Sequence, residues 1–549
     1  MRTLYVYSGN DNISIKNKNN DKIMSYYVGT GKVFCENLSN INDQDALSNV
    51  ALENIDIYSD FIFSLNNIFI EKNLLFNKDL SLYFLTDLSC KRTELFNTFM
   101  HYCNSIYINE CIKKYKIDNV VMDSCEDGLV QSIKSILGNI TYIERNTKFK
   151  RRYIIKSLLR STSFFIGTIC KVIFCKIYTK NKFVRENKIN NIFLTRFPLH
   201  LSKENKEGKF GDFVKDGDSF LVNIITDGYH QNINIKDFIN SLKTLSTKEN
   251  VILLDKYLKL KDIFACFTYS FILRFKSRAL FKRNYICNGI NISNDIHYEL
   301  SFSMKRIPRL LMWKNSINDL LRDYSIHNFY YYLFEYSYGK FFTYALGSQE
   351  TKINLIGFQH GPSSMNKILH MSAKGELVDN GDWVKSFQPP KKIFSEDVNS
   401  AFIYRKAGDR NGEIMDKIYR LSYLNQLKTI GPGATCFVIV PGLHDGEFLL
   451  SLLKERIEKD KQVKYIINLH PRANNSFVKN FSNISNLSIA TSLNDSLSVA
   501  EKVIGTYSSA LVEAYLLGIS VEMVEIPGKI NESPLRDKLF LENSYKIKF

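Results

Sequence analysis

The sequence predicts an α/β protein with parallel sheets, and two observations carry this prediction. Short apolar runs that end in polar residues or glycine recur along the chain, and each is followed by a stretch with helical spacing. In addition, 549 residues are more than one ordinary hydrophobic core accommodates. We therefore expect two Rossmann-like lobes that face a crevice, an acceptor-side lobe of residues 1–345 and a donor-binding lobe of residues 346–549.

The predicted strands are apolar runs rich in β-branched or aromatic residues and bounded by turn residues. The first covers residues 1–7 and ends in Ser8-Gly9-Asn10. In parallel sheets, ligands gather at the carboxyl ends of strands, where helix N-termini offer free N–H groups. The motifs discussed below follow such strand ends. The other predicted strands cover residues 119–124, 191–196, 220–226, 251–255, 353–358, 436–440, 465–469, 502–505 and 520–526.

Charge and cysteine usage narrow the class of protein. The chain has 73 Lys and Arg against 56 Asp and Glu, a net charge of +17, which favours anionic partners. Nucleic acid is disfavoured, because the basic residues cluster with aliphatic ones and form no polar stripe with stacking aromatics. The ten cysteines show no CxxC pair or zinc-like spacing, and no secretory signal precedes them. We expect reduced, mostly buried thiols in a cytoplasmic protein.

Residues 148–188 break the alternating pattern. They combine aliphatic and aromatic residues with many Lys and Arg, and their uncharged centre, residues 161–170, is shorter than the about 20 residues that span a bilayer. We expect a helical insertion that lies on an anionic membrane surface, at the inner face of the cytoplasmic membrane. The alternative is a helix pair that covers the core with a solvated basic face. Residues 263–283 have a similar composition.

The last third of the chain carries the most specific constellation. His470-Pro471 closes one predicted strand, and Thr506-Tyr507-Ser508-Ser509 closes another. An imidazole, hydroxyls and helix N–H groups are the groups that stabilise a departing phosphate. Gly442, in a Pro-Gly turn after a third strand, is a candidate contact for the donor base or ribose. Taken singly, the serines are equally explained as helix caps, His470 as a structural histidine, and Gly442 as an ordinary turn.

These motifs resemble a known family of enzymes. The chain is similar to GT-B transferases of capsule and surface-carbohydrate assembly, a group with bacterial sialyltransferases, Kdo transferases and the glycerophosphotransferases of teichoic acid synthesis. The resemblance implies a GT-B fold, a cytidine-nucleotide donor, and no catalytic metal or cofactor. It covers roughly residues 190–540 and rests on Thr195-Arg196-Phe197-Pro198, Gly357-Phe358-Gln359-His360-Gly361, His470-Pro471, Tyr507-Ser508-Ser509 with Glu513 and Gly518, and Asn531-Glu532-Ser533-Pro534-Leu535.

The resemblance offers candidates for the catalytic base, which takes the proton of the acceptor hydroxyl. In sialyltransferases an acidic-acidic-Gly motif supplies it, which implies Asp127 in Glu126-Asp127-Gly128; an acidic helix N-terminus is the alternative. In glycerophosphotransferases a His-Gly motif activates the acceptor, which implies His360; the alternative is a buried histidine that holds a turn. Glu335 is a third candidate, with a solvated or salt-bridged carboxylate as its alternative.

The expected function is a glycosyltransferase of bacterial surface polysaccharide synthesis. It would transfer an acidic, nonulosonate-type sugar from a CMP donor to a lipid-linked glycan acceptor. The donor would be bound by Gly442, His470, Pro471, Ser508, Ser509 and Glu513. Two alternatives stay open: a CDP-dependent transferase of a polyol phosphate, and a non-catalytic scaffold that binds a nucleotide sugar.

Overall fold

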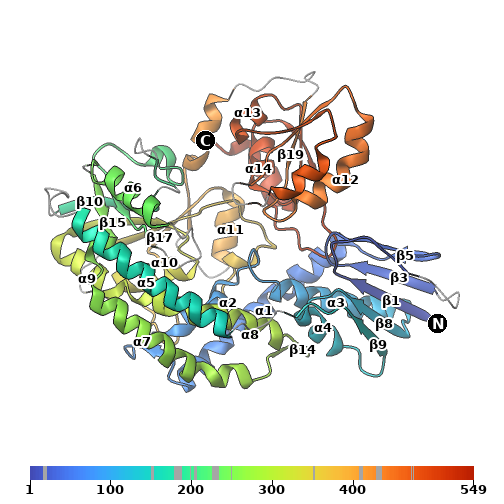
Figure 1. Cartoon of the computed structure of the whole chain (residues 1–549), viewed down its shortest axis with the longest axis horizontal. Coiled ribbons are helices and arrows are strands. Elements are labelled where there is room, and N and C mark those ends of the chain that lie inside the picture. The colour runs from blue at the N-terminus through green and yellow to red at the C-terminus, as the bar shows by residue number, and fades with distance from the viewer. Residues whose placement is uncertain are drawn as a thin grey trace.

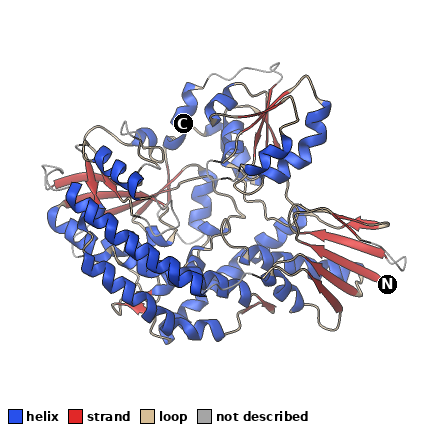
Figure 2. Cartoon of the chain, in the orientation of Figure 1, coloured by secondary structure: helices blue, strands red, loops and turns tan. Residues whose placement is uncertain are grey.

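The computed structural model consists of three parallel β-sheets connected by helices (Figures 1 and 2). The predicted α/β class with parallel sheets is therefore confirmed. The structure describes residues 1–549 except 16–21, 150–153, 179–187, 198–199, 203–206, 226–233, 249, 350–352, 407–411, 428–435, 471–472 and 474, and it describes only the backbone of residues 154–160.

The N-terminal sheet lies at one end of the molecule and has the strand order β5-β3-β1-β8-β9 (Figure 1). All its strand pairs are parallel. The central strand β1 is buried from Leu4 to Tyr7. Leu4 and Val6 belong to the core that includes α1 and α3, whereas Tyr5 and Tyr7 pack on the other face with Ile13 and Val33 from the connections between the strands. The strands are β1 (Arg2–Tyr7), β3 (Lys22–Tyr27), β5 (Leu38–Asn40), β8 (Asn119–Asp123) and β9 (Thr141–Arg145), and the helices are α1 (Gln44–Glu71), α3 (Thr98–Tyr115) and α4 (Asp127–Lys134).

The central sheet has the strand order β12-β11-β10-β15-β16-β17-β18, again with parallel pairs. The expected lobe division after residue 345 falls in α10 (Ser337–Gly347), which connects the neighbouring strands β15 and β16. The central sheet therefore continues across that division. Its strands are β10 (Lys188–Thr195), β11 (Ser219–Val222), β12 (Val251–Leu253), β15 (Ser325–Tyr332), β16 (Asn354–Phe358), β17 (Lys392–Ser395) and β18 (Gly412–Ile414).

The C-terminal sheet has the order β21-β20-β19-β22-β23. Separate apolar clusters cover its two faces, one around Leu449 and Tyr465 and the other around Val438 and Leu511. The N-terminal and central sheets instead share one continuous core. The strands are β19 (Cys436–Val440), β20 (Lys464–Ile467), β21 (Leu487–Ile489), β22 (Lys502–Gly505) and β23 (Ser520–Met523), with α12 (Gly446–Lys459), α13 (Leu493–Ser498), α14 (Ser509–Leu516) and α15 (Lys538–Asn543).

The described part of the predicted basic insertion contains one long helix, α5 (Ile154–Tyr178). Before this helix, Lys148 pairs with Glu126 of the N-terminal part in an isolated β-bridge, and after it Lys188 begins β10. Helix α5 lies beside α7 (Leu260–Lys276) on the outside of the molecule, and the rings of Phe165 and Phe267 are 5.4 Å apart (Figure 1). By length and composition alone, Ser161–Tyr178 is also long enough to cross a membrane, and 22% of this segment is buried.

The described residues also form three two-stranded pairs and further α-helices. They are the strand pairs β2 (Ile13–Ser14) with β4 (Val33–Phe34), β6 (Leu75–Phe76) with β7 (Leu80–Ser81), and β13 (Ile286–Cys287) with β14 (Ile290–Asn291), and the helices α2 (Asp87–Cys90), α6 (Ile235–Leu245), α8 (Ser293–Leu311), α9 (Lys314–Asp323) and α11 (Val398–Lys406).

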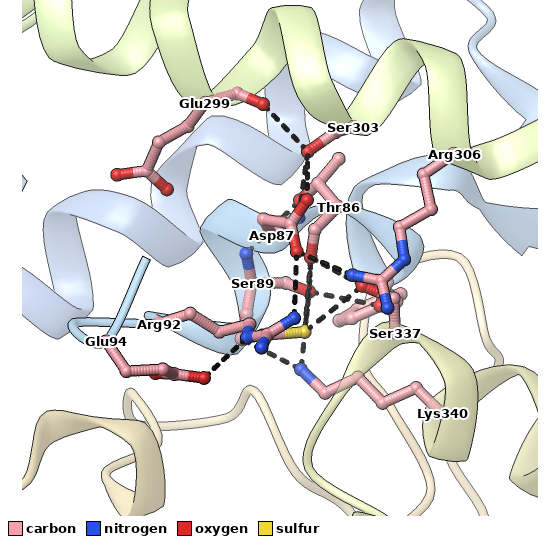
Figure 3. A network of polar contacts seen from close by, with 12 residues as sticks. Thr86, Asp87, Ser89, Arg92, Glu94, Glu299, Ser303, Arg306, Ser337 and Lys340 are labelled. Atoms are coloured by element: carbon pink, nitrogen blue, oxygen red, sulfur yellow. Dashed lines mark hydrogen bonds and ion pairs between the residues drawn. The ribbon is translucent and has the colours of Figure 1, made fainter. Parts of the chain in front are cut away.

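A buried polar network on α8 joins the N-terminal part to the central sheet (Figure 3). The carboxylate of Asp87, in α2, is fully buried and accepts a 2.8 Å hydrogen bond from Arg306 of α8. Ser303 accepts a hydrogen bond from the Asp87 amide, and Lys340 of α10 donates to the carbonyl of Ser89. About two turns before Ser303, at the N-terminal end of α8, Asp295 contacts His101 of α3 at 2.8 Å. The same face of α8 therefore holds elements of both sheets.

We expect Asp87→Ala to lower the free energy of unfolding by about 3–5 kcal/mol. The substitution removes the carboxylate that compensates Arg306, whose side chain is only 2% exposed. Denaturant unfolding followed by circular dichroism measures the loss. Glu455→Ala, which removes an exposed partner of Lys459, is the control and should change stability by less than about 0.5 kcal/mol. A loss for Asp87→Ala as small as that of the control would contradict the role of this network.

Candidate functional site

The carboxyl edges of the central and C-terminal sheets meet, and we call this meeting place the sheet junction. Arg420, in the short helix Tyr419–Gln426 between the two sheets, donates to Glu396 after β17 at 2.7 Å. Its guanidinium also lies 3.8 Å from Glu513 of α14. The segment after β23 returns to the central sheet, where Asp537 accepts a 2.9 Å hydrogen bond from the Met365 amide. Ligands of parallel sheets bind at such strand ends.

Two of the predicted catalytic residues come together at this junction. Glu335 follows β15 and is buried, and its Oε2 lies 3.9 Å from Nδ1 of His360, which follows β16. Its other oxygen accepts a 2.9 Å hydrogen bond from Tyr404 and lies 3.3 Å from Nδ1 of His370. The Glu335 carboxylate therefore sits between two imidazoles. Glu335 is buried and not solvated, and its contacts with the two histidines have the distances of the salt-bridged alternative. His370 is a neighbour that the strand-end pattern did not identify.

Burial keeps both imidazoles neutral. It lowers the pKa of His360 well below the usual value, and the positive charges of Lys367 and Lys209 lower it further. Burial likewise lowers the pKa of His370. The His360 side chain keeps 17% of its surface exposed, so it is the one that a bound molecule can reach. A neutral, accessible imidazole is able to accept a proton from a hydroxyl.

Unpartnered polar atoms gather in the loop after β16. Among the described residues, the buried hydroxyls of Ser363 and Ser364 and the buried amide oxygen of Asn366 have no hydrogen-bond partner, and neither has the amide oxygen of Asn399 across the loop. Buried polar groups in folded proteins are normally paired, because an unpaired one costs free energy. Their concentration beside His360 indicates that a polar ligand or water completes this part of the junction.

The predicted donor residues line one edge of the C-terminal sheet. Gly442, His470 and Ser508 follow β19, β20 and β22, which are consecutive strands. The Gly442 amide donates to the Thr506 hydroxyl at 2.7 Å, which joins the turns after β19 and β22. His470 is half-buried at its strand end, whereas Pro471 lies outside the described residues.

The serine pair and Glu513 have different environments. Ser508 caps α14, and its hydroxyl accepts from the Ala510 amide at 3.3 Å, so the capping interpretation describes its present contact. Ser509 is exposed at the same helix end. Glu513 is buried further along α14 and accepts a hydrogen bond from Tyr423, and burial raises its pKa. Glu513 therefore lies against the connection between the sheets and not at the helix N-terminus.

Several cations at the junction were not singled out from the sequence. Lys209, Lys367 and Arg420 all act on His360 through their charge. Lys529, in the segment after β23, lies 3.1 Å from Asp445, which in turn accepts a hydrogen bond from Thr506. These side chains come from four separate segments, so no local motif contains them. Together they make the junction suitable for an anion such as a phosphate.

Asp127 lies in another part of the molecule. It is the first residue of α4 at the carboxyl edge of the N-terminal sheet, where its amide donates to the Lys148 carbonyl at 3.0 Å. Whereas His360 follows β16 of the central sheet, Asp127 follows β8 of the N-terminal sheet. Its neighbour Glu126 lies 3.4 Å from the buried His101. This position agrees with the acidic helix N-terminus that was the alternative to a base.

The described residues contain no group of three or more His, Cys, Asp or Glu side chains that is suited to hold a metal ion.

Comparison with known proteins gives only remote similarity. No protein-family model and no curated protein matches the chain. UDP-GlcNAc 2-epimerase from Neisseria meningitidis is 11% identical with a TM-score of 0.34, over 66% of this chain and 87% of that one. The wall teichoic acid polymerase TagF, in a structure with CDPG, is 11% identical with a TM-score of 0.28, over 66% and 78%. The glycotransferase of kitacinnamycin is 11% identical with a TM-score of 0.33, over 65% and 84%. Similarity this low transfers no function.

The free energy of unfolding should depend on pH through His360 and His370. The pKa of each imidazole is lowered in the folded state, so below about pH 6.5 the unfolded chain binds more protons and stability falls. His360→Gln and His370→Gln should each flatten this fall between about pH 7 and 5, by at most about 1.4 kcal/mol per pH unit. Urea unfolding at a series of pH values measures the slope.

The test compares variants, because buried carboxyl groups act in the opposite direction. Burial raises the pKa of Asp397 to about 6, for example, so the folded chain gains stability from this group as the pH falls. His444→Gln, at an exposed position, is the control variant. Slopes for His360→Gln and His370→Gln that equal the wild-type slope would contradict the neutral state of these imidazoles.

Proposed function

We propose that this protein is a transferase of GT-B type that moves a group from a nucleotide-activated donor to an acceptor hydroxyl at the sheet junction. The observation that carries the proposal is the neutral, accessible His360 beside the buried Glu335. Both residues lie at the sheet junction, next to the carboxyl edge of the C-terminal sheet. One edge supplies a proton acceptor and the other supplies a helix N-terminus and hydroxyls. These are the two halves that group transfer from a phosphate requires.

In this mechanism His360 takes the proton of the acceptor hydroxyl. The hydroxyl oxygen forms a bond to the donor carbon while the bond from that carbon to the phosphate oxygen breaks. Glu335 orients His360 and stabilises the imidazolium that forms. Ser508, the N-terminus of α14 and His470 receive the departing phosphate, with Arg420 and Lys529 as nearby positive charge. Gly442 lies beside the expected position of the base or ribose.

The donor that we favour is a CMP-activated acidic sugar, and the acceptor is a lipid-linked surface glycan. The motifs shared with surface-carbohydrate transferases support this choice. A CDP-activated polyol phosphate is the second candidate, because it would use the same edge; nucleophilic attack would then occur at phosphorus. A non-catalytic scaffold is less consistent with the junction, since binding alone does not require a neutral imidazole held against a buried carboxylate.

We further propose that α5 and α7 place the enzyme on an acidic membrane surface. Each helix leaves an apolar stripe in solvent: Ile166, Ile173 and Ile177 on α5, and Phe264, Phe271, Ile272 and Phe275 on α7. Lys176, Lys276 and Arg278 are exposed at the ends of these stripes. The opposite face of α5 packs on the protein through Phe165 and Val172, which favours a helix that lies on the membrane. Lys171 is half-buried toward Asp255 and is not available to lipid.

The donor proposal predicts that CMP or CDP raises the melting temperature more than UMP, UDP or GDP, because a ligand of the folded state stabilises it in proportion to its affinity. His470→Ala and Ser508→Ala should reduce this shift. His360→Ala should keep the shift but lower the transfer rate by about 10²–10⁴-fold. Thermal shift and a transfer assay on the same preparations provide both measurements.

Asp127→Asn is the matched control for the base. It should transfer at nearly the wild-type rate, because Asp127 lies at the edge of a different sheet. Loss of transfer in Asp127→Asn with full activity in His360→Ala would assign the base to Asp127. Equal or larger shifts with uridine or guanosine nucleotides would overturn the cytidine donor.

The membrane proposal predicts that Phe271→Ser with Phe275→Ser reduces binding to vesicles rich in phosphatidylglycerol at least about tenfold. Burial of one such ring in an apolar phase contributes about 1.5–3 kcal/mol. Lys276→Gln with Arg278→Gln should weaken binding similarly, at about 1 kcal/mol per charge, and rising salt should weaken the native protein. Vesicle co-sedimentation measures all three effects.

Leu452→Ser on α12 is the control, because Leu452 is similarly exposed but lies on the C-terminal sheet. Its binding should equal that of the wild type. Binding that ignores both double substitutions and salt would instead favour α5 and α7 as a purely structural helix pair.

A further inference from the structure

Arg196 is a buried guanidinium without a partner. It directly follows β10, in the middle of the central sheet, and only 3% of its surface is exposed. Neither of its terminal nitrogens has a hydrogen-bond partner within the described part of the chain. The guanidinium carbon lies 4.6 Å from the centroid of the Tyr338 ring. Burying a charge without compensation costs free energy, so such a group is uncommon in a folded protein.

Other buried arginines of this chain are compensated. Arg306 pairs with Asp87 at 2.8 Å, and Arg92 pairs with Glu94 at 2.7 Å. Arg420 forms a double contact with Glu396. The fold therefore supplies a carboxylate where an arginine has a structural role. Arg196 lacks this feature.

The first described carboxylate after Arg196 along the chain, Glu207, is committed elsewhere. Glu207 accepts hydrogen bonds from the Thr195 hydroxyl at 2.8 Å and from the amides of Lys209 and Phe210. Burial also raises the pKa of Glu207 to about 7, so near neutral pH it carries only part of a negative charge. Glu207 therefore does not neutralise Arg196.

Two more unpartnered groups lie on the adjoining strand ends. Asn223 follows β11, the neighbour of β10, and both of its side-chain polar atoms are buried without a partner. Tyr332 ends β15, the neighbour on the other side, and its buried hydroxyl has no partner in hydrogen-bonding geometry. Burial raises the pKa of Tyr332 well above its usual value, the negative charge of Glu207 raises it further, and the positive charge of Arg196 lowers it. Three consecutive strands thus end in buried hydrogen-bonding groups that lack partners.

We propose that Arg196, Asn223 and Tyr332 form an oxyanion site that receives a carboxylate or phosphate of the acceptor. A guanidinium presents parallel N–H groups that match both anions, and amide and phenol groups donate to the remaining oxygens. We assign the anion to the acceptor because the central sheet carries the base, whereas the donor phosphate is assigned to the C-terminal sheet. This assignment rests on the proposed transferase function, but the anion site itself does not.

The test uses the full chain and compares the wild type with Arg196→Met. Inorganic phosphate and glucuronate are titrated separately at constant ionic strength, with chloride as the background ion. We expect at least one probe to raise the wild-type melting temperature, and Arg196→Met to lose that shift. Without a probe, Arg196→Met should melt at the wild-type temperature or above it, because it removes an uncompensated buried charge. A response to phosphate alone assigns a phosphate of the acceptor, and one to glucuronate alone assigns an acidic sugar.

Arg456→Met is the matched control, because Arg456 pairs with Glu522 on the C-terminal sheet and is partly exposed. It should keep the wild-type response. If Arg196→Met does not fold, Arg196→Lys is used as the test variant. A lysine ammonium lacks the parallel N–H groups of the planar guanidinium, so this variant should bind the probe at least about tenfold more weakly. Two results would overturn the site: no response of the wild type to either probe, or an unchanged response in the Arg196 variants. Nucleotide binding is measured in the same variants and should be unchanged, so failure of the donor proposal is seen separately.

Discussion

The buried ion pair between Asp87 and Arg306 is the contact on which the arrangement of the site depends. Arg306 belongs to α8, and Asp87 to α2, which contacts α10 of the central sheet. From α2 the chain continues into Arg92, whose guanidinium stacks on Tyr336 at 4.2 Å. The ring of Tyr336 is in turn 5.4 Å from that of His360. The Asp87 carboxylate of the N-terminal part thereby helps to hold Tyr336, which packs beside His360 at the sheet junction.

The junction itself combines groups that stabilise the fold with groups that do not. Arg420 and Glu396 compensate each other and hold the connection between the sheets. His360, Ser363, Ser364 and Arg196 instead leave buried donors or acceptors unpaired. Proteins keep such costly groups where a ligand or a reaction uses them, because selection for stability alone would remove them. These four residues follow strands of the central sheet, which is why we place the acceptor chemistry there.

The molecule has three large parallel sheets, one more than two Rossmann-like lobes require. The carboxyl edge of the C-terminal sheet meets that of the central sheet through Arg420 and Glu513. It also meets the N-terminal sheet, where the Gly29 amide donates to the Pro527 carbonyl at 3.0 Å. The N-terminal and central sheets share one core. Asp127, the candidate base identified from a short acidic motif, belongs to the N-terminal sheet. The other candidate bases, Glu335 and His360, belong to the central sheet. Glu335 and His360 follow neighbouring strands and were brought together by the sheet order.

The sequence alone determined the parallel α/β class, most strand positions, the amphipathic character of α5 and α7, and the strand ends that carry Gly442, His360, His470 and Ser508. These features depend on local periodicity and on turn residues, which a single segment contains. Tertiary structure decided the strand order, the continuation of the central sheet past residue 345, and the environments of His370, Arg420 and Arg196. Strand pairing and the partners of a buried charge join segments that are distant along the chain. Whether a guanidinium is compensated is therefore settled only when those segments meet.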